Sequence, residues 1–323
     1  MLEILAVTFP FFALIGIGYA AARSKILPIE AVPGLNVFTL YFALTAMLFQ
    51  LGARTPIGEL LDPVVLGTWF LAGILVMGIG VFTARRIHKS WLDASFGGLI
   101  ATLPNSGFMG VPLLIALVGP EAAGPISASL IIDIVFMQSI AVALSQRGSG
   151  EHHGVWPEIR GSLIRMAKNP LPWAIVLGGL WGWLGLHLPG PVDSLVTMLA
   201  AAATPAALFT IGAVLAREQG TAPKGRIRTG VRAWGDVYWL AVLKLFAHPL
   251  LMWAIGRGAI AAGLPLGETA LNVLVLTAAL PAAANVSVLA ERFGADNGRI
   301  ARVILVSTIL SFATFTVAVA LLL

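Results

Sequence analysis

The sequence contains no cysteine and few charged residues, and each shortage excludes a class of protein. Without cysteine the chain has neither a disulfide framework nor a thiolate metal site. Charged residues make up 11% of the 323 positions, against roughly 25% in soluble domains, while 58% are hydrophobic and the mean hydropathy is +0.92. A soluble domain of this length could not bury so much apolar side chain, so the excess is expected to face lipid.

Other absences narrow the chemistry. No G-x-x-x-x-G-K-[ST] phosphate loop occurs, so the chain itself is not expected to use ATP or another cofactor. The adjacent pair His152 and His153 lies in a charged loop and is typical of solvated residues rather than of a metal site. Basic residues lie in short loops between apolar runs, which argues against a nucleic-acid surface. The first apolar run follows Glu3 rather than a basic segment, so we expect a retained helix, not a signal peptide.

Long apolar runs are what the sequence has in abundance. A membrane-spanning helix needs about 20 mostly apolar residues, and in lipid such a run must be helical to satisfy its backbone. The sequence therefore predicts an all-α integral membrane protein with ten transmembrane helices, which we expect at residues 3–22, 35–53, 63–84, 94–118, 124–146, 170–188, 192–216, 237–260, 267–291 and 300–323.

The basic residues alternate between the two sides of this predicted bundle. Every lysine and arginine except Arg54, Lys244 and Arg257 lies in or beside the loops that follow the first, third, fifth, seventh and ninth helices. Because basic loops stay in the cytoplasm, both termini are expected outside and the central loop, 147–169, inside.

The central loop separates two sets of five helices, and an odd number per set requires the second set to be inverted. Internal similarity agrees, since FALTAMLFQLGA (42–53) aligns with AATPAALFTIGA (202–213) and LIATLP (99–104) with LTAALP (276–281). Secondary transporters commonly use such inverted repeats, with the substrate site near the midplane between them. We therefore expect a first repeat at 1–146, a cytoplasmic linker at 147–169 and a second repeat at 170–323.

Two apolar runs are interrupted at corresponding places. LPNSGFMGVP (103–112) breaks predicted helix 4, and LPAAANVS (280–287) breaks predicted helix 9. Proline and glycine weaken a helix, and the freed backbone groups survive in a membrane only where they are buried in protein or line a cavity. The alternative is a pair of simple proline kinks. If the breaks form a substrate site, its candidate residues are Pro104, Asn105, Ser106, Gly107, Gly110, Pro281 and Asn285. The two asparagine amides could bind substrate or satisfy the freed backbone.

These segments carry a family resemblance, together with LIGIGYAAARSKIL (14–27), LNVFTLYFALTAMLF (35–49), TPAALFTIGAVLA (204–216) and LKLFAHPL (243–250). In order and spacing they resemble the auxin efflux carrier family along essentially the whole chain. The resemblance implies two inverted five-helix repeats, with helices 4 and 9 broken and crossing. It also implies a wider kinship with sodium/bile-acid symporter-like proteins. Bacterial members are associated with carboxylates such as malonate and malate, and plant members with auxin.

The chain departs from the family at one place and resembles one branch at another. Thr45 stands where the family often has proline, whereas its counterpart Pro205 is kept, so any motion that relies on a kink in helix 2 is in doubt. The short central loop resembles bacterial members, which implies a bacterial cytoplasmic (inner) membrane.

A few polar residues lie inside the predicted helices. Asp133 is the only carboxylate predicted deep in the membrane, where a charge costs about 2.5–3.5 kcal/mol, so it is either a proton carrier or a structural partner. Lys244 is open to three interpretations: snorkelling to the cytoplasmic surface, pairing with Asp133, or attracting an anionic substrate. His248 is expected to pack. Tryptophans near predicted helix ends suggest an interfacial belt: Trp69, Trp91, Trp156, Trp173 and Trp239.

Together these observations predict a secondary transporter that moves a small organic anion, a mono- or dicarboxylate, by alternating access. Proton coupling through Asp133 and Lys244 is one option. The alternatives are an uncoupled facilitator or channel, and a sodium-coupled symporter of the bile-acid type. An intramembrane enzyme would need a paired nucleophile and base, or a metal cluster, which the sequence does not offer. Substrate, H+ or Na+, and lipid are the expected partners, and a homodimer is left open.

Overall fold

The computed structural model describes residues 2–55, 58, 62–148, 170–221 and 231–323, and within these ranges helices joined by short loops are the only regular structure apart from one isolated bridge between Pro104 and Ala282. The elements in chain order are α1 (Leu2–Arg23), η1 (Ile29–Ala31), α2 (Val32–Val37), η2 (Phe38–Ala43), α3 (Leu44–Arg54), α5 (Pro63–Arg86), α6 (Trp91–Thr102), η3 (Ser106–Gly110), α7 (Val111–Val118), η4 (Pro120–Ala122), α8 (Ala123–Ile132), η5 (Asp133–Met137), α9 (Gln138–Ser145), η6 (Gln146–Gly148), α11 (Pro170–Trp183), α12 (Gly190–Thr221), α13 (Val231–Val242), η7 (Leu243–Ala247), α14 (His248–Ala261), α15 (Glu268–Ala279), α16 (Asn285–Phe293) and α17 (Asn297–Leu322).

The predicted apolar runs are confirmed as helical within the described ranges. Six described helices are long and apolar enough to cross a membrane, and shorter apolar helices accompany them. The predicted breaks are real, because α6 is separated from η3 and α15 from α16. The eighth run begins at Val231 rather than at 237, so Asp236 lies inside a helix and not at its end. Nearly all of the predicted linker, 149–169, lies outside the described residues.

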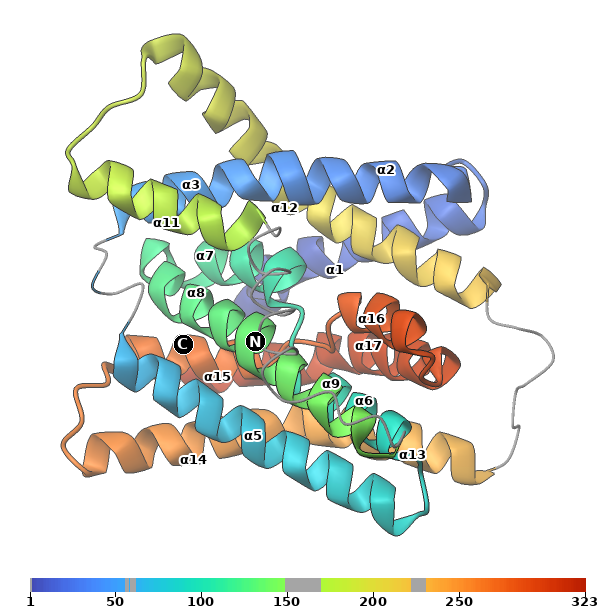
Figure 1. Cartoon of the computed structure of the whole chain (residues 1–323). Helices are drawn as coiled ribbons and strands as arrows, with labels where there is room; N and C mark the ends of the chain where they lie inside the picture. Colours follow the sequence, from blue (N-terminus) through green and yellow to red (C-terminus); the bar gives the residue numbers. More distant parts are fainter. Residues whose placement is uncertain (1, 56–57, 59–61, 149–169, 222–230) are drawn as a thin grey trace.

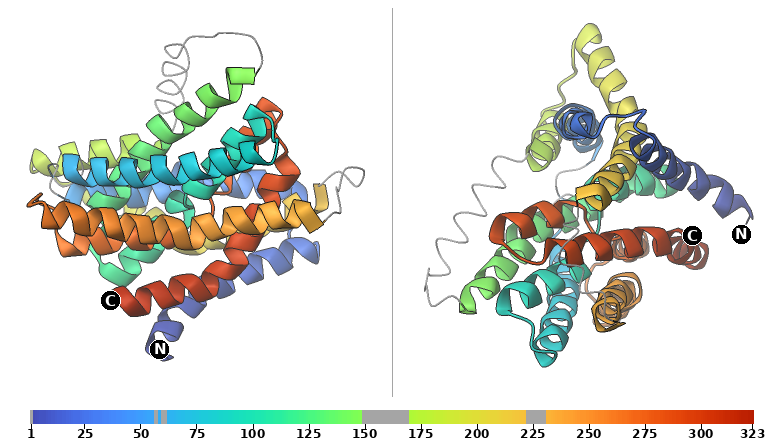
Figure 2. Two further views of the ribbon diagram at one scale, coloured as in Figure 1. Left: turned by 90° about the horizontal axis from the view of Figure 1, so that it is seen from below. Right: turned by 90° about the vertical axis from the view of Figure 1, so that its right-hand side faces the viewer.

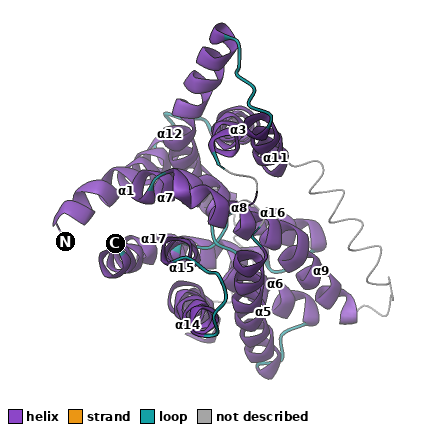
Figure 3. Cartoon of the chain, turned by 90° about the vertical axis from the view of Figure 1, so that its left-hand side faces the viewer, coloured by secondary structure: helices purple, strands orange, loops and turns teal. Residues whose placement is uncertain are grey.

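The helices form two groups, each of which takes helices from both halves of the chain (Figures 1 and 3). In one group α1 packs against α12, and α3 packs against both α11 and α12. The other group contains α5, α6, α9, α13 to α15 and α17, with α7 and α8 between the two groups in Figure 3. The start of α1 and the end of α17 lie close together (Figure 2).

Local sequence fixes several helix starts. Asp62 accepts hydrogen bonds from the backbone N–H groups of Val64 (2.7 Å) and Val65 at the start of α5, where Pro63 has no N–H and so needs no acceptor. The Ser90 hydroxyl caps α6 and the Asp296 carboxylate caps α17 in the same way. Each cap stabilises its helix by about 1 kcal/mol.

Glycine lets α1 and α12 approach until their backbones touch. A β-carbon added at Gly18 would overlap the carbonyl group of Phe209, and one added at Gly212 would lie 2.9 Å from the carbonyl carbon of Ile15. No larger side chain fits at either position without moving a helix.

The same contact occurs between α11 and α3. A β-carbon at Gly178 would overlap the carbonyl group of Phe49, and one at Gly52 would lie 3.1 Å from the carbonyl carbon of Ile175. The residues of the two contacts correspond one to one, and the numbers in each pair differ by 160: Gly18 and Gly178, Phe49 and Phe209, Gly52 and Gly212, Ile15 and Ile175. The alignment of 42–53 with 202–213 has the same shift.

Candidate functional site

The two interrupted segments meet and exchange backbone hydrogen bonds. The Asn105 N–H donates to the Pro281 carbonyl at 2.9 Å, and the Ala283 N–H donates to the Leu103 carbonyl at 3.0 Å. Each break therefore supplies the partners that the other lost when its helix stopped. This exchange offsets the several kcal/mol that each unpaired backbone group would cost inside a membrane.

Further contacts hold the crossing. The Ala282 N–H donates to the Ser307 hydroxyl of α17 at 3.1 Å. The Asn105 carbonyl accepts from the N–H groups of Met109 and Gly110, both at 3.0 Å, which starts the wide helical turn η3. A β-carbon at Gly110 would lie 2.8 Å from the Leu280 side chain, so glycine permits the close approach of the two breaks.

Two polar side chains at the first break are buried. The Ser106 hydroxyl is buried without a hydrogen-bond partner among the described residues. Asn105 is 5% exposed, and its side chain makes no capping hydrogen bond to the turn η3 that follows it. A buried polar group without a partner costs about 1–3 kcal/mol, and such groups in native proteins often face a ligand or water.

The remaining predicted substrate residues are placed unequally. Pro104 and Pro281 are buried within the crossing, and Gly107 is half-buried, with the side chains of Leu171 and Leu130 as its nearest neighbours. Asn285, the first residue of α16, is exposed. The two breaks are thus brought together, but Asn105 is buried whereas Asn285 is exposed.

Asp133 and Lys244 belong to a second buried cluster. The Trp69 indole N–H donates to Asp133 at 2.9 Å, and the Trp69 ring packs against the His248 ring with centroids 5.2 Å apart. The Lys244 ammonium lies 3.3 Å from Nδ1 of His248. Asp133 is 4% exposed, and the other three are fully buried. The cluster joins helices from both halves of the chain.

Lys244 bonds to the end of a broken helix rather than to Asp133. Its ammonium donates to the Ala278 carbonyl at 2.6 Å, one residue before α15 stops. The last carbonyls of a helix lack partners and carry partial negative charge, so this lysine caps the half-helix. No ion pair joins it to Asp133 among the described residues. The snorkelling interpretation is wrong, because Lys244 is fully buried.

Sequence reasoning missed the partners in this cluster. Trp69 was assigned to an interfacial belt, which is wrong for this residue because it is fully buried and hydrogen-bonded to Asp133. His248 packs as expected, but it also carries polar contacts. Since an ammonium can only donate, Nδ1 of His248 accepts, which places the ring proton on Nε2, an atom with no partner in the described part of the chain.

A third cluster was also missed. The Arg299 guanidinium binds Asp236 through both carboxylate oxygens, at 2.5 and 3.0 Å, and donates to the Asp93 carbonyl at 2.7 Å. Arg299 is 2% exposed and Asp236 9%. The cluster ties together the starts of α6 and α17 and the middle of α13. The only sequence signal was their position: Asp93, Asp236 and Arg299 each stand directly before a predicted apolar run.

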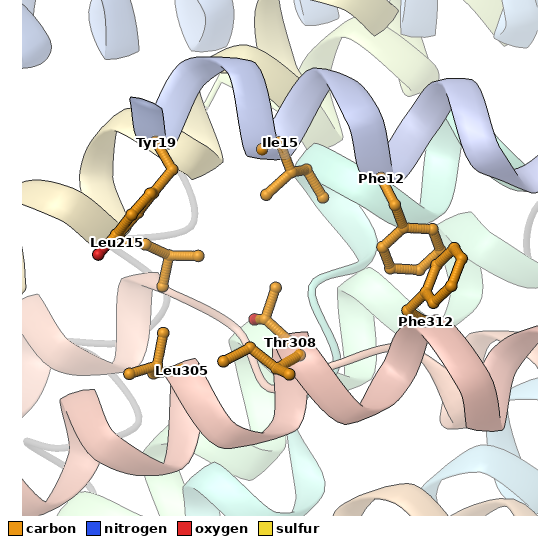
Figure 4. A pocket seen from close by; sticks show the side chains of 9 residues that line it. Phe12, Ile15, Tyr19, Leu215, Leu305, Thr308 and Phe312 are labelled. Atoms are coloured by element: carbon orange, nitrogen blue, oxygen red, sulfur yellow. The ribbon is translucent and has the colours of Figure 1, made fainter. Parts of the chain in front are cut away.

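A mostly apolar cavity of about 380 Å³ lies between α1, α12 and α17 (Figure 4). The rings of Phe12 and Phe312 meet edge to face at one end, with centroids 5.1 Å apart, and Tyr19 and Leu215 line the other end. Thr308, also in its wall, follows the serine that bonds the second break. The volume is at the low end for a small-molecule site.

The fold is that of a multi-pass membrane protein, and comparison with known proteins shows that it is a transporter rather than an enzyme. Residues 4–319 match the family described as "Membrane transport protein", so the chain belongs to this family, that of the auxin efflux carriers. It is 31% identical over 320 residues to the "Putative malonate transporter" of Rhizobium meliloti (strain 1021), covering 98% of this chain and 95% of the relative.

More distant relatives span bacteria and plants. The chain is 25% identical to the "Uncharacterized transporter YfdV" of Escherichia coli (strain K12), over 88% of this chain and 86% of the relative. It is 23% identical to "Auxin efflux carrier component 5" of Arabidopsis thaliana, over 88% of this chain and 87% of the relative.

Proposed function

We propose that this protein is a secondary transporter that moves a small organic anion across a bacterial cytoplasmic membrane by alternating access. One observation carries the proposal: the two breaks bond to each other, the Ser106 hydroxyl is buried there without a described partner, and the Asn105 side chain beside it caps no helix. A carboxylate could accept hydrogen bonds from both groups. The relative named for malonate transport supports a mono- or dicarboxylate substrate.

Positive helix ends support an anion in particular. The first residues of α16 and of η3 begin at the crossing, and helix N-termini present unpaired N–H groups and partial positive charge. Discontinuous helices in transporters use these ends to hold anionic groups. We include Pro104, Asn105, Ser106, Gly107, Gly110, Pro281 and Asn285 in the proposed site, with Asn285 at its exposed edge.

Ten transmembrane helices in two inverted repeats, 1–146 and 170–323, remain our proposal for the architecture. The 160-residue shift that relates the α1–α12 contact to the α11–α3 contact supports it, because chance would not repeat both glycines and both partners. The neighbouring ends of α1 and α17 fit an even number of crossings (Figure 2). With this helix count, the positive-inside rule applied to the basic loops supports both termini outside.

Asn105 is the sharpest test of the substrate site. Replacing it with alanine removes a donor that a carboxylate would use, so we expect malonate to bind about 10-fold more weakly or worse, since a hydrogen bond to a charged group contributes about 1.5–3 kcal/mol. Asn272→Ala is the matched control, because Asn272 donates to the Leu322 carbonyl, away from the breaks. It should lower the melting temperature without changing affinity. Unchanged malonate affinity in both Asn105→Ala and Asn285→Ala would move the site elsewhere.

Proton coupling through Asp133 is the finer part of the proposal. Asp133→Asn keeps the shape and the acceptor for Trp69 but cannot ionise, so uptake driven by a pH gradient in proteoliposomes should stop while counterflow continues. Gradient-driven uptake by the variant would reduce Asp133 to a structural residue. Wild-type uptake that needs sodium would favour the symporter alternative, and uptake that follows neither gradient would favour a facilitator.

Lys244 has two proposed roles that a double variant separates. If it is mainly the cap of α15, Asp133→Asn should not recover the stability lost in Lys244→Met. If it is mainly the counter-ion of Asp133, the double variant should be more stable than Lys244→Met alone, because no buried charge is left uncompensated. The direct bond to Ala278 favours the first outcome.

A further inference from the structure

Two arginines share one indole at the end of the helical bundle where α5 stops. The Arg85 guanidinium lies 4.8 Å from the centre of the Trp91 ring, and the Arg147 guanidinium lies 5.7 Å from the same ring. Arg85 comes from the end of α5, Trp91 from the start of α6, and Arg147 from η6, which follows α9 (Figure 1). Arg85 and Trp91 lie only six residues apart, whereas Arg147 reaches the same ring from 56 residues further along the chain.

Among the described residues, these guanidinium groups have no acidic partner. Neither arginine forms an ion pair with a described residue, and both are exposed. The nearby carboxylates are committed elsewhere: Asp93 accepts from Ser90 and from the Asp296 N–H, and Asp236 binds Arg299. The positive charge around Trp91 is therefore not compensated within the described part of the protein.

The position of this group at the end of an apolar span fits the level of a lipid headgroup. Phe82, one turn before Arg85, is 58% exposed, as expected of a side chain against lipid, while Arg86 lies over its ring at 4.8 Å. Tryptophan prefers the boundary between acyl chains and headgroups. The Lys89 ammonium is paired with Asp236 at 3.9 Å, but the Lys89 backbone carbonyl accepts from Arg85 at 2.5 Å, which fixes that guanidinium.

We infer that Arg85, Arg147 and Trp91 form a binding site for the phosphate of an anionic phospholipid. Two like charges held over one ring repel, and a phosphate between them would relieve that repulsion and accept hydrogen bonds from both. Basic pockets between transmembrane helices bind anionic headgroups in this way. The bound lipid would join α5, α6 and η6, beside the Arg299 cluster.

The test uses purified, delipidated full-length protein and its melting temperature. Phosphatidylglycerol in mixed micelles should raise the melting temperature in a concentration-dependent way, because a ligand that binds the folded state stabilises it. Zwitterionic phosphatidylcholine should not. Each of Arg85→Gln and Arg147→Gln should weaken the apparent lipid affinity about five-fold, which corresponds to about 1 kcal/mol per basic residue. Added salt should weaken it further.

Three controls make the result decisive. Arg23→Gln removes an exposed arginine at the end of α1, away from Trp91, and should leave the lipid effect unchanged. The double variant with Arg85→Lys and Arg147→Lys keeps the charge but loses the planar fork, so it should lose most of the effect. Each variant is compared with its own lipid-free melting temperature, which separates lipid binding from a loss of stability.

Other outcomes would overturn the inference. Equal stabilisation by phosphatidylcholine would mean that no anionic site exists. An undiminished effect in the lysine pair would mean diffuse surface attraction instead of a built site. The same rise with millimolar inorganic phosphate alone would assign the site to a free anion. None of these results depends on the transported substrate.

Discussion

The contact between α1 and α12 predicts a sharp difference between two neighbouring glycines. Gly18 lies against the backbone of Phe209, whereas an added β-carbon at Gly16 would meet nothing within 4 Å. Gly18→Ala and Gly16→Ala are therefore the same chemical change at two positions about half a turn apart on α1. Only Gly18→Ala requires the two helices to separate.

The magnitude follows from the geometry. A β-carbon at Gly18 would lie 2.8 Å from the Phe209 carbonyl carbon, whereas carbon atoms prefer about 3.5–4.0 Å. The helices must move apart by about 1 Å, and such overpacking typically costs about 1–3 kcal/mol. Alanine also favours a helix over glycine by about 1 kcal/mol, but this gain is common to both variants. Their difference in stability therefore isolates the packing penalty, about 1–3 kcal/mol.

The assay is thermal unfolding of both variants in the same detergent, with size-exclusion chromatography to confirm monodisperse protein. Gly16→Ala should match or exceed the wild-type melting temperature, and Gly18→Ala should melt several degrees below Gly16→Ala, at about 2–4 °C per kcal/mol for chains of 150–250 residues. By the proposed repeat, Gly178→Ala should behave like Gly18→Ala. Equal melting temperatures for Gly16→Ala and Gly18→Ala would refute the close contact. A harmless Gly178→Ala would refute the equivalence of the two contacts.

Three further predictions concern orientation and the buried charges. Because the chain lacks cysteine, single cysteines at exposed Ser24 and Ser194 should react with an impermeant reagent only from the cytoplasmic and only from the outer side, respectively, and the reverse pattern would contradict the proposed topology. Asp236→Asn should destabilise the protein by about 3–5 kcal/mol because Arg299 loses its buried counter-charge, and replacing both residues by apolar ones should recover most of that loss in the same unfolding assay. Lys244→Met should cost about 1.5–3 kcal/mol through the lost cap, so a variant as stable as wild type would exclude that cap.

Some features of this protein follow from the sequence alone because they depend on local composition. Apolar runs of about 20 residues specify helices wherever lipid is the solvent, and the helices form where those runs predict them. The breaks at Pro104 and Pro281 are equally local, because proline lacks an N–H whatever its neighbours are. Motif order along the chain was enough to indicate the family.

The partners of these residues were decided only by tertiary structure. Nothing local in the sequence tells that the first break donates to Pro281, that Trp69 reaches Asp133, or that Lys244 caps α15 instead of pairing with that aspartate. Such contacts join positions up to about half the chain apart, and a helix face can be buried against lipid or protein with the same apolar residues. Inside a membrane each buried polar group needs a hydrogen-bond partner. Only the packing of the helices determines which partner lies within reach, so these contacts could not be predicted from the sequence.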